Sequence, residues 1–311
     1  MASVKETAAA RGTDRVIGLD WGTSSFRAYL MDGGGAVLDR REAADGILAV
    51  QDFDGCFERH CGAWADANPT APILLAGMIG SRQGWVEAPY CPCPAGAVEI
   101  ARRLTPHVTA RGRKIALVPG LSWQSSSGAD DVMRGEETQI LGVAAPGRQV
   151  LVLPGTHSKW AEAVDGRVIR FSTFMTGEVF AAMSKHTILG RLMAGEGHDP
   201  RTFAAGIAAS GEAGGLLHHL FRVRTAGLFA RWPAESLSAL LSGLVIGHEV
   251  RAAQAFFAAE RVRVVGGAAL AERYAEALAA LGLAATTGPA DAAARGLARL
   301  ARQMTVPELS S

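Results

Sequence analysis

Four residues near the start of the chain have types and spacing suited to binding phosphate. Asp20 follows an apolar run and precedes Gly22, Thr23 and Ser24. A glycine lets a phosphate approach the backbone closely, and successive N–H groups and hydroxyls can then surround its oxygens. Asp20 would hold a hydrated Mg²⁺ against those oxygens, because Mg²⁺ is bound through few carboxylates and keeps several waters. The alternative is a turn in which Asp20 only accepts hydrogen bonds from backbone N–H groups.

A second turn of the same kind, Gly155–Thr156, follows 133 positions after Gly22–Thr23. The hairpin signals Asp32–Gly33 and Asp165–Gly166 are separated by the same 133 positions. An equal offset at both pairs of turns predicts two copies of a strand–turn–strand unit, and therefore two similar domains that face each other. The alternative is a coincidence between two ordinary meanders.

The side chains of the second turn differ from those of the first. Leu153 occupies the position that corresponds to Asp20, so the repeated unit does not require an acid there, which favours a metal-binding role for Asp20. The hydroxyl of Thr156 could bind the other end of a polyphosphate, and His157 and Lys159 could add positive charge. The alternative places His157 and Lys159 on the surface of a hairpin.

The segment 133–139 is typical of a loop that enters a helix. Glu136 and Glu137 would lie in the first helical turn, where the helix dipole favours acidic side chains. We expect a general base here, with Arg134 as a substrate ligand, at the seam between the two domains. The alternative is a pair of acids that only stabilise the start of the helix.

Two glycine-containing segments could complete a ligand site. Ser81, Arg82 and Trp85 lie in a polar loop after an apolar strand, where Trp85 could stack on a small ligand or, alternatively, anchor the core. Gly266 and Gly267 lie between a predicted strand and a predicted helix, so that a flat ligand such as adenine could lie against the backbone. The chain contains neither the P-loop pattern nor the G-x-G-x-x-G spacing of dinucleotide-binding folds.

The elements that must position these residues follow from hydrophobic periodicity. Strands are predicted over 15–20, 26–31, 36–41, 72–77, 114–119, 168–174 and 261–265. Two further strands are predicted within 151–160, one before and one after the second Gly-Thr turn. Helices are predicted over 53–67, 98–104, 178–193, 235–260, 269–281 and 291–304. Strands and helices in this order indicate an α/β fold of two domains with mixed sheets.

Composition excludes several classes of protein. The chain has 311 residues, 49% of them apolar and 20% charged, as in globular proteins of about two domains. Its net charge of +1 gives no electrostatic reason to expect nucleic acid or an anionic membrane as a partner. No apolar run approaches the ~20 residues of a membrane span. Residues 1–14 lack the apolar core of a signal peptide, and we expect a disordered tail.

The four cysteines, Cys56, Cys61, Cys91 and Cys93, form no C-x-x-C pair. Unpaired thiols are typical of a reducing compartment, so we expect a cytoplasmic location. The sequence leaves the oligomeric state open, a homo-oligomer included.

In their order along the chain, these motifs resemble those of the actin-like ATPase superfamily of sugar kinases, hexokinases, chaperones and actin. Asp20–Thr23 resembles its first phosphate motif, Pro154–Thr156 its second, and Val265–Ala268 its adenosine motif. Residues 294–297 resemble its second connecting helix. The resemblance implies two domains of this fold separated by a cleft: residues 15–142 on the sugar and phosphate side, and residues 143–311 on the nucleotide side, with the last helix able to pack back.

More specifically, the chain resembles the 2-dehydro-3-deoxygalactonokinase family. The matching stretches are 17–27, 75–81 with 84–85, 133–142, 153–160, 175–178 and 241–249. The resemblance implies ATP-dependent phosphorylation of 2-dehydro-3-deoxy-D-galactonate at its terminal hydroxyl, with Mg²⁺, in galactonate breakdown. It also implies that Glu178 binds substrate. The alternatives are a kinase for another small sugar acid, such as the gluconate epimer, and a non-catalytic nucleotide-gated sensor of the same fold.

The identity of the base stays open between two acids. Glycerol-kinase-like enzymes carry a Gly-Asp-Gln stretch at this place, and alignment with it gives Glu136 the position of the base. A hexokinase-like Asp-Thr pair instead favours Glu137, because Thr138 follows it. We favour Glu137 slightly on the sequence alone.

Overall fold

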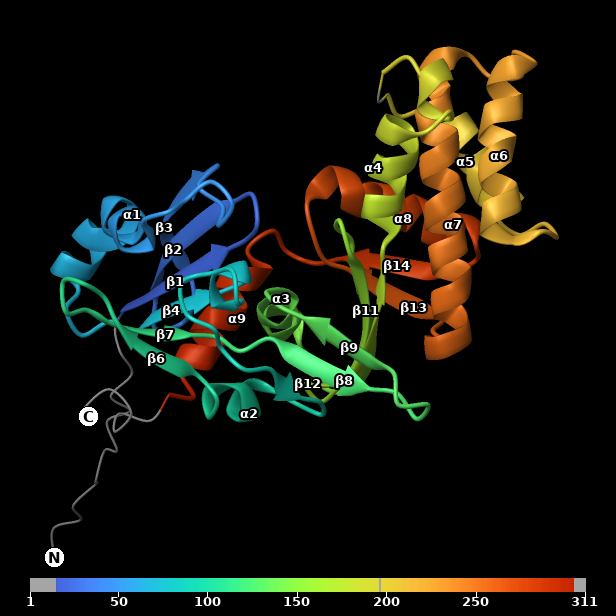
Figure 1. Cartoon of the computed structure of the whole chain (residues 1–311). Helices are drawn as coiled ribbons and strands as arrows, with labels where there is room; N and C mark the ends of the chain where they lie inside the picture. Colours follow the sequence, from blue (N-terminus) through green and yellow to red (C-terminus); the bar gives the residue numbers. More distant parts are fainter. Residues whose placement is uncertain (1–14, 196, 305–311) are drawn as a thin grey trace, which may run out of the picture.

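The computed structural model describes residues 15–195 and 197–304, so the tail predicted over 1–14 lies outside the described residues. A six-stranded sheet occupies the N-terminal half (Figure 1), with its strands in the order β3-β2-β1-β4-β7-β6. Its members are β1 (Arg15–Trp21), β2 (Phe26–Asp32), β3 (Val37–Ala43), β4 (Ile73–Ala76), β6 (Thr105–Val108) and β7 (Lys114–Leu117).

A five-stranded sheet repeats this topology in the second half, in the order β12-β11-β10-β13-β14. Its members are β10 (Arg148–Leu153), β11 (Ser158–Val164), β12 (Arg167–Phe174), β13 (Arg261–Val264) and β14 (Ala284–Thr287). In both sheets an antiparallel meander of three strands is followed by a parallel neighbour of its first strand, β4 or β13. The structure thus confirms the repeat that the offset of 133 positions predicted.

A third, small sheet was not predicted. It contains β5 (Cys91–Pro92), β8 (Leu121–Gln124) and β9 (Asp130–Met133), in that order. This sheet contacts the second one: the carboxylate of Asp131 accepts hydrogen bonds from the backbone N–H and the hydroxyl of Thr173 on β12, at 2.7 and 2.6 Å. An isolated bridge between Ala95 and Val168 adds to the contact.

The helices match the predictions in part. They are α1 (Phe53–Ala67), α2 (Ala97–Ala101), α3 (Glu136–Val143), α4 (Thr176–His186), α5 (Pro200–Ala209), α6 (Gly215–Leu228), α7 (Leu237–Phe257), α8 (Ala268–Ala280) and α9 (Ala292–Ala301). The helix predicted over 178–193 was too long, since α4 ends at His186. Helices α5 and α6 were not predicted, although Asp199 caps α5 through its side chain and Pro200 follows at the first helical position.

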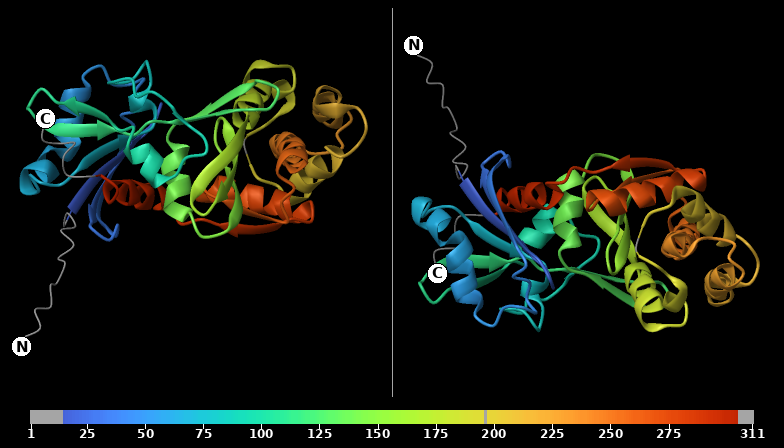
Figure 2. Two further views of the ribbon diagram at one scale, coloured as in Figure 1. Left: turned by 90° about the horizontal axis from the view of Figure 1, so that it is seen from below. Right: turned by 90° about the horizontal axis from the view of Figure 1, so that it is seen from above.

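The last helix packs back on the first sheet. Leu297 and Leu300 of α9 lie in one hydrophobic cluster with Val16 and Met31 of the meander. The two views of Figure 2 show α9 beside the first sheet although it follows the second sheet in the chain. The domain limits at residues 142 and 143 stay a prediction.

Helices α3 and α9 touch through their backbones. A Cβ atom at Gly142 would lie 1.8 Å from the carbonyl oxygen of Ala292, and one at Gly296 would lie 1.8 Å from that of Thr138. No side chain fits between these helices at either point, so both positions require glycine.

The second sheet is covered by a group of helices around α7. Most residues of α7 are buried on all sides, against α4, α5, α6 and α8. Within the described residues, no helix combines the length and the apolar character that crossing a membrane requires.

The four cysteines are free, and three of them are buried. Burial raises the pKa of Cys61 and of Cys93 to about 12, so both thiols stay protonated at neutral pH.

Candidate active site

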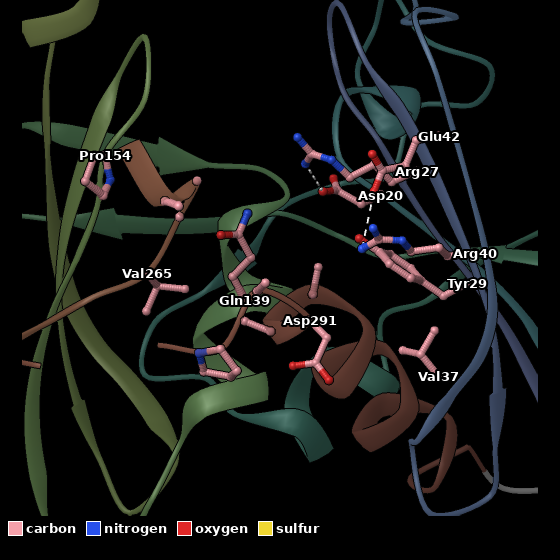
Figure 3. A pocket seen from close by; sticks show the side chains of 17 residues that line it. Asp20, Arg27, Tyr29, Val37, Arg40, Glu42, Gln139, Pro154, Val265 and Asp291 are labelled. Carbon is pink, nitrogen blue, oxygen red and sulfur yellow. Dashed lines mark hydrogen bonds and ion pairs between the residues drawn. The ribbon is translucent and has the colours of Figure 1, made fainter. Parts of the chain in front are cut away.

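A pocket of about 430 Å³ lies between the two large sheets. Figure 3 shows side chains of β1, β2 and β3 on one wall, with Pro154 and Val265 opposite them. Gln139 of α3 and Asp291, next to α9, complete the site in this view. Of the residues predicted from sequence, the pocket is lined by Asp20, Gly266 and Gly267.

Asp20 is buried at the pocket wall and forms an ion pair. Its Oδ2 atom lies 3.1 Å from Nη1 of Arg27, which is its partner residue across the β1–β2 pair. Burial raises the pKa of Asp20, and the positive charge of Arg27 opposes this shift. Arg27 was not predicted from the sequence, although a four-residue turn closed by Gly22 and Ser25 places residues 20 and 27 opposite each other.

Unsatisfied polar atoms gather at the entrance to α3. Three buried side-chain atoms in the described part of the chain have no hydrogen-bond partner: Nε and Nη1 of Arg134, and Oε1 of Glu137. The third guanidinium nitrogen of Arg134 donates to the carbonyl oxygen of Ala88 at 2.7 Å, and the guanidinium carbon lies 4.5 Å from the ring centre of Tyr90. Since buried polar atoms are almost always paired, this concentration makes the entrance to α3 a candidate ligand site.

The two neighbouring acids have different surroundings. Glu137 is fully buried, and its Oε2 accepts a hydrogen bond of 2.6 Å from the N–H of Gly135. Burial raises the pKa of Glu137 to about 8, with a further contribution from the charge of Glu136. A carboxyl group with this pKa is mostly protonated at neutral pH.

Glu136 is the more accessible of the two, with 23% of its side chain exposed. Its Oε2 accepts from the N–H of Arg134 at 3.0 Å, and its Oε1 lies 3.9 Å from Nζ of Lys159. Burial raises its pKa, while the charge of Lys159 opposes the shift. Lys159 is only 6% exposed, so it is not the surface residue that one alternative placed on the hairpin.

The second Gly-Thr turn is fixed by the start of α4. The N–H of Glu178 donates to the carbonyl oxygen of Thr156, and Gly177 lies so close that a Cβ there would be 2.4 Å from the carbonyl oxygen of Gly155. Nε2 of His157 lies within hydrogen-bonding distance of Oε2 of Glu178, and both side chains are about half exposed. The structure therefore places Glu178 at this turn, in contact with His157.

A buried carboxylate supports this turn from behind. Glu249 of α7 accepts hydrogen bonds from Ser158 Oγ and Trp160 Nε1, both at 2.7 Å, and from the Tyr274 hydroxyl at 2.6 Å. It thereby joins α7, β11 and α8 at one point. Glu249 ends the stretch 241–249 that resembles the family, but no role was predicted for it from the sequence.

The first Gly-Thr turn is held by the loop that follows β3. The N–H groups of Ile47 and Leu48 donate to the carbonyl oxygens of Gly22 and Thr23, at 3.0 and 3.2 Å. Thr23 and Ser24 are exposed, so their hydroxyls are available to a ligand.

The loop with Ser81, Arg82 and Trp85 is engaged with the protein itself. Ser81 Oγ donates to the carbonyl oxygen of Met78 at 2.7 Å, and Arg82 is 86% exposed and paired with Glu87. Trp85 packs among aromatic rings that include Trp21, with centroids 6.5 Å apart, which agrees with the alternative of a core anchor.

The pocket also contains polar residues that the sequence analysis did not select. They are Arg27, Arg40, Glu42, Gln139 and Asp291. Arg27 lies on β2, and Arg40 and Glu42 lie two positions apart on β3, so that they share one face of that strand. This two-residue spacing is the only signal in the sequence that could have indicated them.

Two sheets of the same topology, with Gly-Thr turns and crossed helices between them, define the actin-like ATPase fold of sugar kinases. A solved structure of the activator of 2-hydroxyisocaproyl-CoA dehydratase from Clostridium difficile shares this fold, with a TM-score of 0.51, 13% identity, and coverage of 93% of this chain and 94% of that chain.

The family model described as 2-keto-3-deoxy-galactonokinase matches residues 20–300. The chain is 41% identical to a probable 2-dehydro-3-deoxygalactonokinase of Rhizobium meliloti, covering 91% of this chain and 95% of that protein. It is 33% identical to the 2-dehydro-3-deoxygalactonokinase of Escherichia coli, with coverage of 90% and 95%. A crystal structure of a 2-dehydro-3-deoxygalactonokinase candidate from Sinorhizobium meliloti matches with a TM-score of 0.85, 37% identity, and coverage of 94% and 99%. The chain therefore belongs to the 2-keto-3-deoxy-galactonokinase family.

Proposed function

We propose that the protein transfers the γ-phosphoryl group of ATP to the terminal hydroxyl of 2-dehydro-3-deoxy-D-galactonate, which gives the 6-phosphate and ADP. The observation that carries this proposal is the family match over residues 20–300. The pocket between the two sheets supports it, because phosphoryl transfer depends on positioning two substrates and on neutralising charge rather than on covalent chemistry.

The polyphosphate of ATP would lie between the two Gly-Thr turns. The exposed hydroxyls of Thr23, Ser24 and Thr156 are available to its oxygens, and His157 adds a group that can carry positive charge. Gly266 and Gly267 line the pocket without side chains, so an adenine ring can lie against the backbone there.

Asp20 fits the requirements of a Mg²⁺ site. It offers a hard oxygen ligand at the wall of a pocket with room for waters, and its Oδ2 is held by Arg27 at 3.1 Å. Mg²⁺ bound there would neutralise charge on the phosphate oxygens. Arg27 would orient the carboxylate.

Glu136 is the base in this proposal. A base must reach the hydroxyl proton, and Glu136 has an exposed side chain while Glu137 has none. The charge of Lys159 would favour the ionised form of Glu136. The preference for Glu137 on the sequence alone therefore gives way to Glu136 on accessibility, and Glu137 would hold the loop through Gly135.

Arg134 is proposed to bind the carboxylate of the sugar acid. Nε and Nη1 of its guanidinium group have no hydrogen-bond partner, so this group has donors left for a carboxylate at the loop before α3. Arg82 is exposed and paired with Glu87, so it is the weaker candidate.

The test is an assay of ADP release with Mg²⁺-ATP and a panel of sugar acids: 2-dehydro-3-deoxy-D-galactonate, its gluconate epimer, and each parent aldonate. We expect turnover with the galactonate derivative to exceed that with the others. Faster turnover with the gluconate epimer would identify a kinase for the other sugar acid. Nucleotide binding without turnover on any member of the panel would identify a sensor and contradict the proposal.

A further inference from the structure

Asp45, Cys56 and His60 form a cluster of metal-ligand types that lies outside the pocket. One potential ligand atom from each of the three residues lies within 4.8 Å of the other two. Cys56 and His60 are separated by one turn of α1, so their side chains extend from the same face of the helix. Asp45 approaches from the loop that follows β3.

The distances in this cluster are close to those of a tetrahedral metal centre. Asp45 Oδ2 lies 3.8 Å from Cys56 Sγ and 2.7 Å from His60 Nε2. With Zn–S bonds of about 2.3 Å and Zn–N or Zn–O bonds of about 2.0 Å, tetrahedral ligand atoms are roughly 3.3–3.6 Å apart. The Asp45–His60 pair would have to open by about half an ångström, exchanging its hydrogen bond for metal ligation, and the Asp45–Cys56 pair would have to close by a few tenths of an ångström.

The surrounding structure holds the ligands in place. Trp21 Nε1 donates to the backbone oxygen of Asp45 at 2.6 Å, and the ring of His60 lies 4.6 Å from that of Phe26. Cys56 is buried in the core, with 1% exposed. The side chains of His60 and Asp45 are 19% and 34% exposed, so a cation can enter and water can supply a fourth ligand.

We propose that Asp45, Cys56 and His60 bind one thiophilic divalent cation of the zinc type. One thiol, one imidazole and one carboxylate are the donor set of zinc, whereas Mg²⁺ and Ca²⁺ prefer oxygen ligands alone. One nearby group opposes binding: a guanidinium nitrogen of Arg59 lies 3.5 Å from Asp45 Oδ2, and this side chain is 62% exposed. Arg59 can move into solvent when a cation takes its place.

The experiment uses Co²⁺ as a spectroscopic probe of the full-length protein, followed by displacement with Zn²⁺. Co²⁺ bound to a thiolate gives a charge-transfer band in the near ultraviolet. We expect this band at one Co²⁺ per chain and its loss when Zn²⁺ is added. Cys56→Ser should abolish the band. His60→Gln should weaken Zn²⁺ affinity by more than about 10-fold, which is the smallest loss usually seen when a residue that only hydrogen-bonds to a metal ligand is changed.

Two further variants control this experiment. Cys93→Ser removes a partly buried thiol away from the cluster and should leave the band and the affinity unchanged. Arg59→Ala removes the competing charge and should tighten Zn²⁺ binding. Thermal unfolding of each variant without metal checks that it folds. The proposal is overturned if the wild-type protein gives no thiolate band, or if His60→Gln binds Zn²⁺ as tightly as the wild type.

Discussion

The two neighbouring acids at the start of α3 differ in how accessible their side chains are to a substrate. Glu136 is accessible and lies 3.9 Å from Lys159, whereas Glu137 is fully buried. We expect Glu136→Gln to lose about 10²–10⁴-fold in kcat, the usual effect of removing a general base, while ATP and the sugar acid still bind. Glu137→Gln should retain most of its kcat, because its amide oxygen can still accept from Gly135. Single-turnover rates and separate binding measurements test this.

The opposite pattern, with the large loss at Glu137→Gln, would return the base to the position that the sequence favoured. Losses of only a few-fold in both variants would mean that neither acid is a base and that positioning alone activates the hydroxyl.

The unpaired N–H groups of Arg134 lead to a prediction about substrate affinity. Arg134→Ala should raise KM for the sugar acid by about 10–150-fold, which corresponds to about 1.5–3 kcal/mol for a hydrogen bond to a charged group. KM for ATP should change little. Arg82→Ala is the matched control, since this exposed arginine is paired with Glu87, and it should stay close to wild type. If Arg82→Ala shows the larger effect, the carboxylate is bound at the 81–85 loop instead.

At the scale of residues, sequence reasoning found the positions but few of their partners. Asp20, Glu136 and Lys159 were all selected, yet the pairs Asp20–Arg27 and Glu136–Lys159 were not predicted. The first pair follows from hairpin register and was within reach. The second joins the first residue of α3 to strand β11, and local periodicity contains no information about such a contact.

At the scale of elements, the crossing of α3 and α9 leaves no room for a side chain. A Cβ at Gly296 would overlap the backbone oxygen of Thr138 at 1.8 Å. Gly296→Ala should therefore lower the free energy of unfolding by about 1–3 kcal/mol, as overpacking usually does, even though alanine favours a helix. Urea denaturation measures this.

The control for that variant is Gly267→Ala. A Cβ at Gly267 meets nothing within 4 Å, so the stability of this variant should stay within about 0.5 kcal/mol of wild type. Equal stability of both variants would mean that the two helices separate easily at their crossing.

Helix α1 and the four-residue strands β4, β7 and β13 were predicted, whereas the strands of the third sheet were not. Helix α1 matches its predicted range of 53–67, because its apolar positions recur with helical spacing over several turns. The strands β5, β8 and β9 contain two to four residues each, too few for a period to appear. Their pairing depends on contacts across the fold rather than on local sequence.

At the scale of the whole molecule, the free energy of unfolding should depend on pH through Glu137. Its pKa is about 8 in the folded protein, against 4.5 for an unperturbed side chain. The folded state therefore binds the proton of Glu137 more tightly than the unfolded state does. This protonation contributes fully to the free energy of unfolding below about pH 4.5, and the contribution is lost as the pH rises through 8. The loss is at most about 1.4 kcal/mol per pH unit. Glu137→Gln removes this slope.

The measurement is urea denaturation of the wild type and Glu137→Gln at intervals from pH 5 to pH 8. The stability of the wild type relative to the variant should fall as pH rises. A constant difference over this range would show that Glu137 keeps an ordinary pKa.

At the scale of the molecule, the internal repeat was the most informative signal in the sequence. The offset of 133 positions predicted both meanders, and the structure extends the equivalence to β4 and β13. The third sheet and helices α5 and α6 have no counterpart in the repeat, so the comparison of the two halves could not indicate them.

During synthesis on a ribosome, β1 emerges long before the helix that covers it. Leu297 and Leu300 of α9 share a hydrophobic cluster with Val16 and Met31, so this part of the core cannot close until the last described helix has been made. At about 5–20 residues per second, the interval between β1 and α9 lasts roughly 15–55 seconds. The nascent chain exposes an apolar sheet face throughout that time, and we expect chaperones that bind apolar segments to associate with it until α9 arrives.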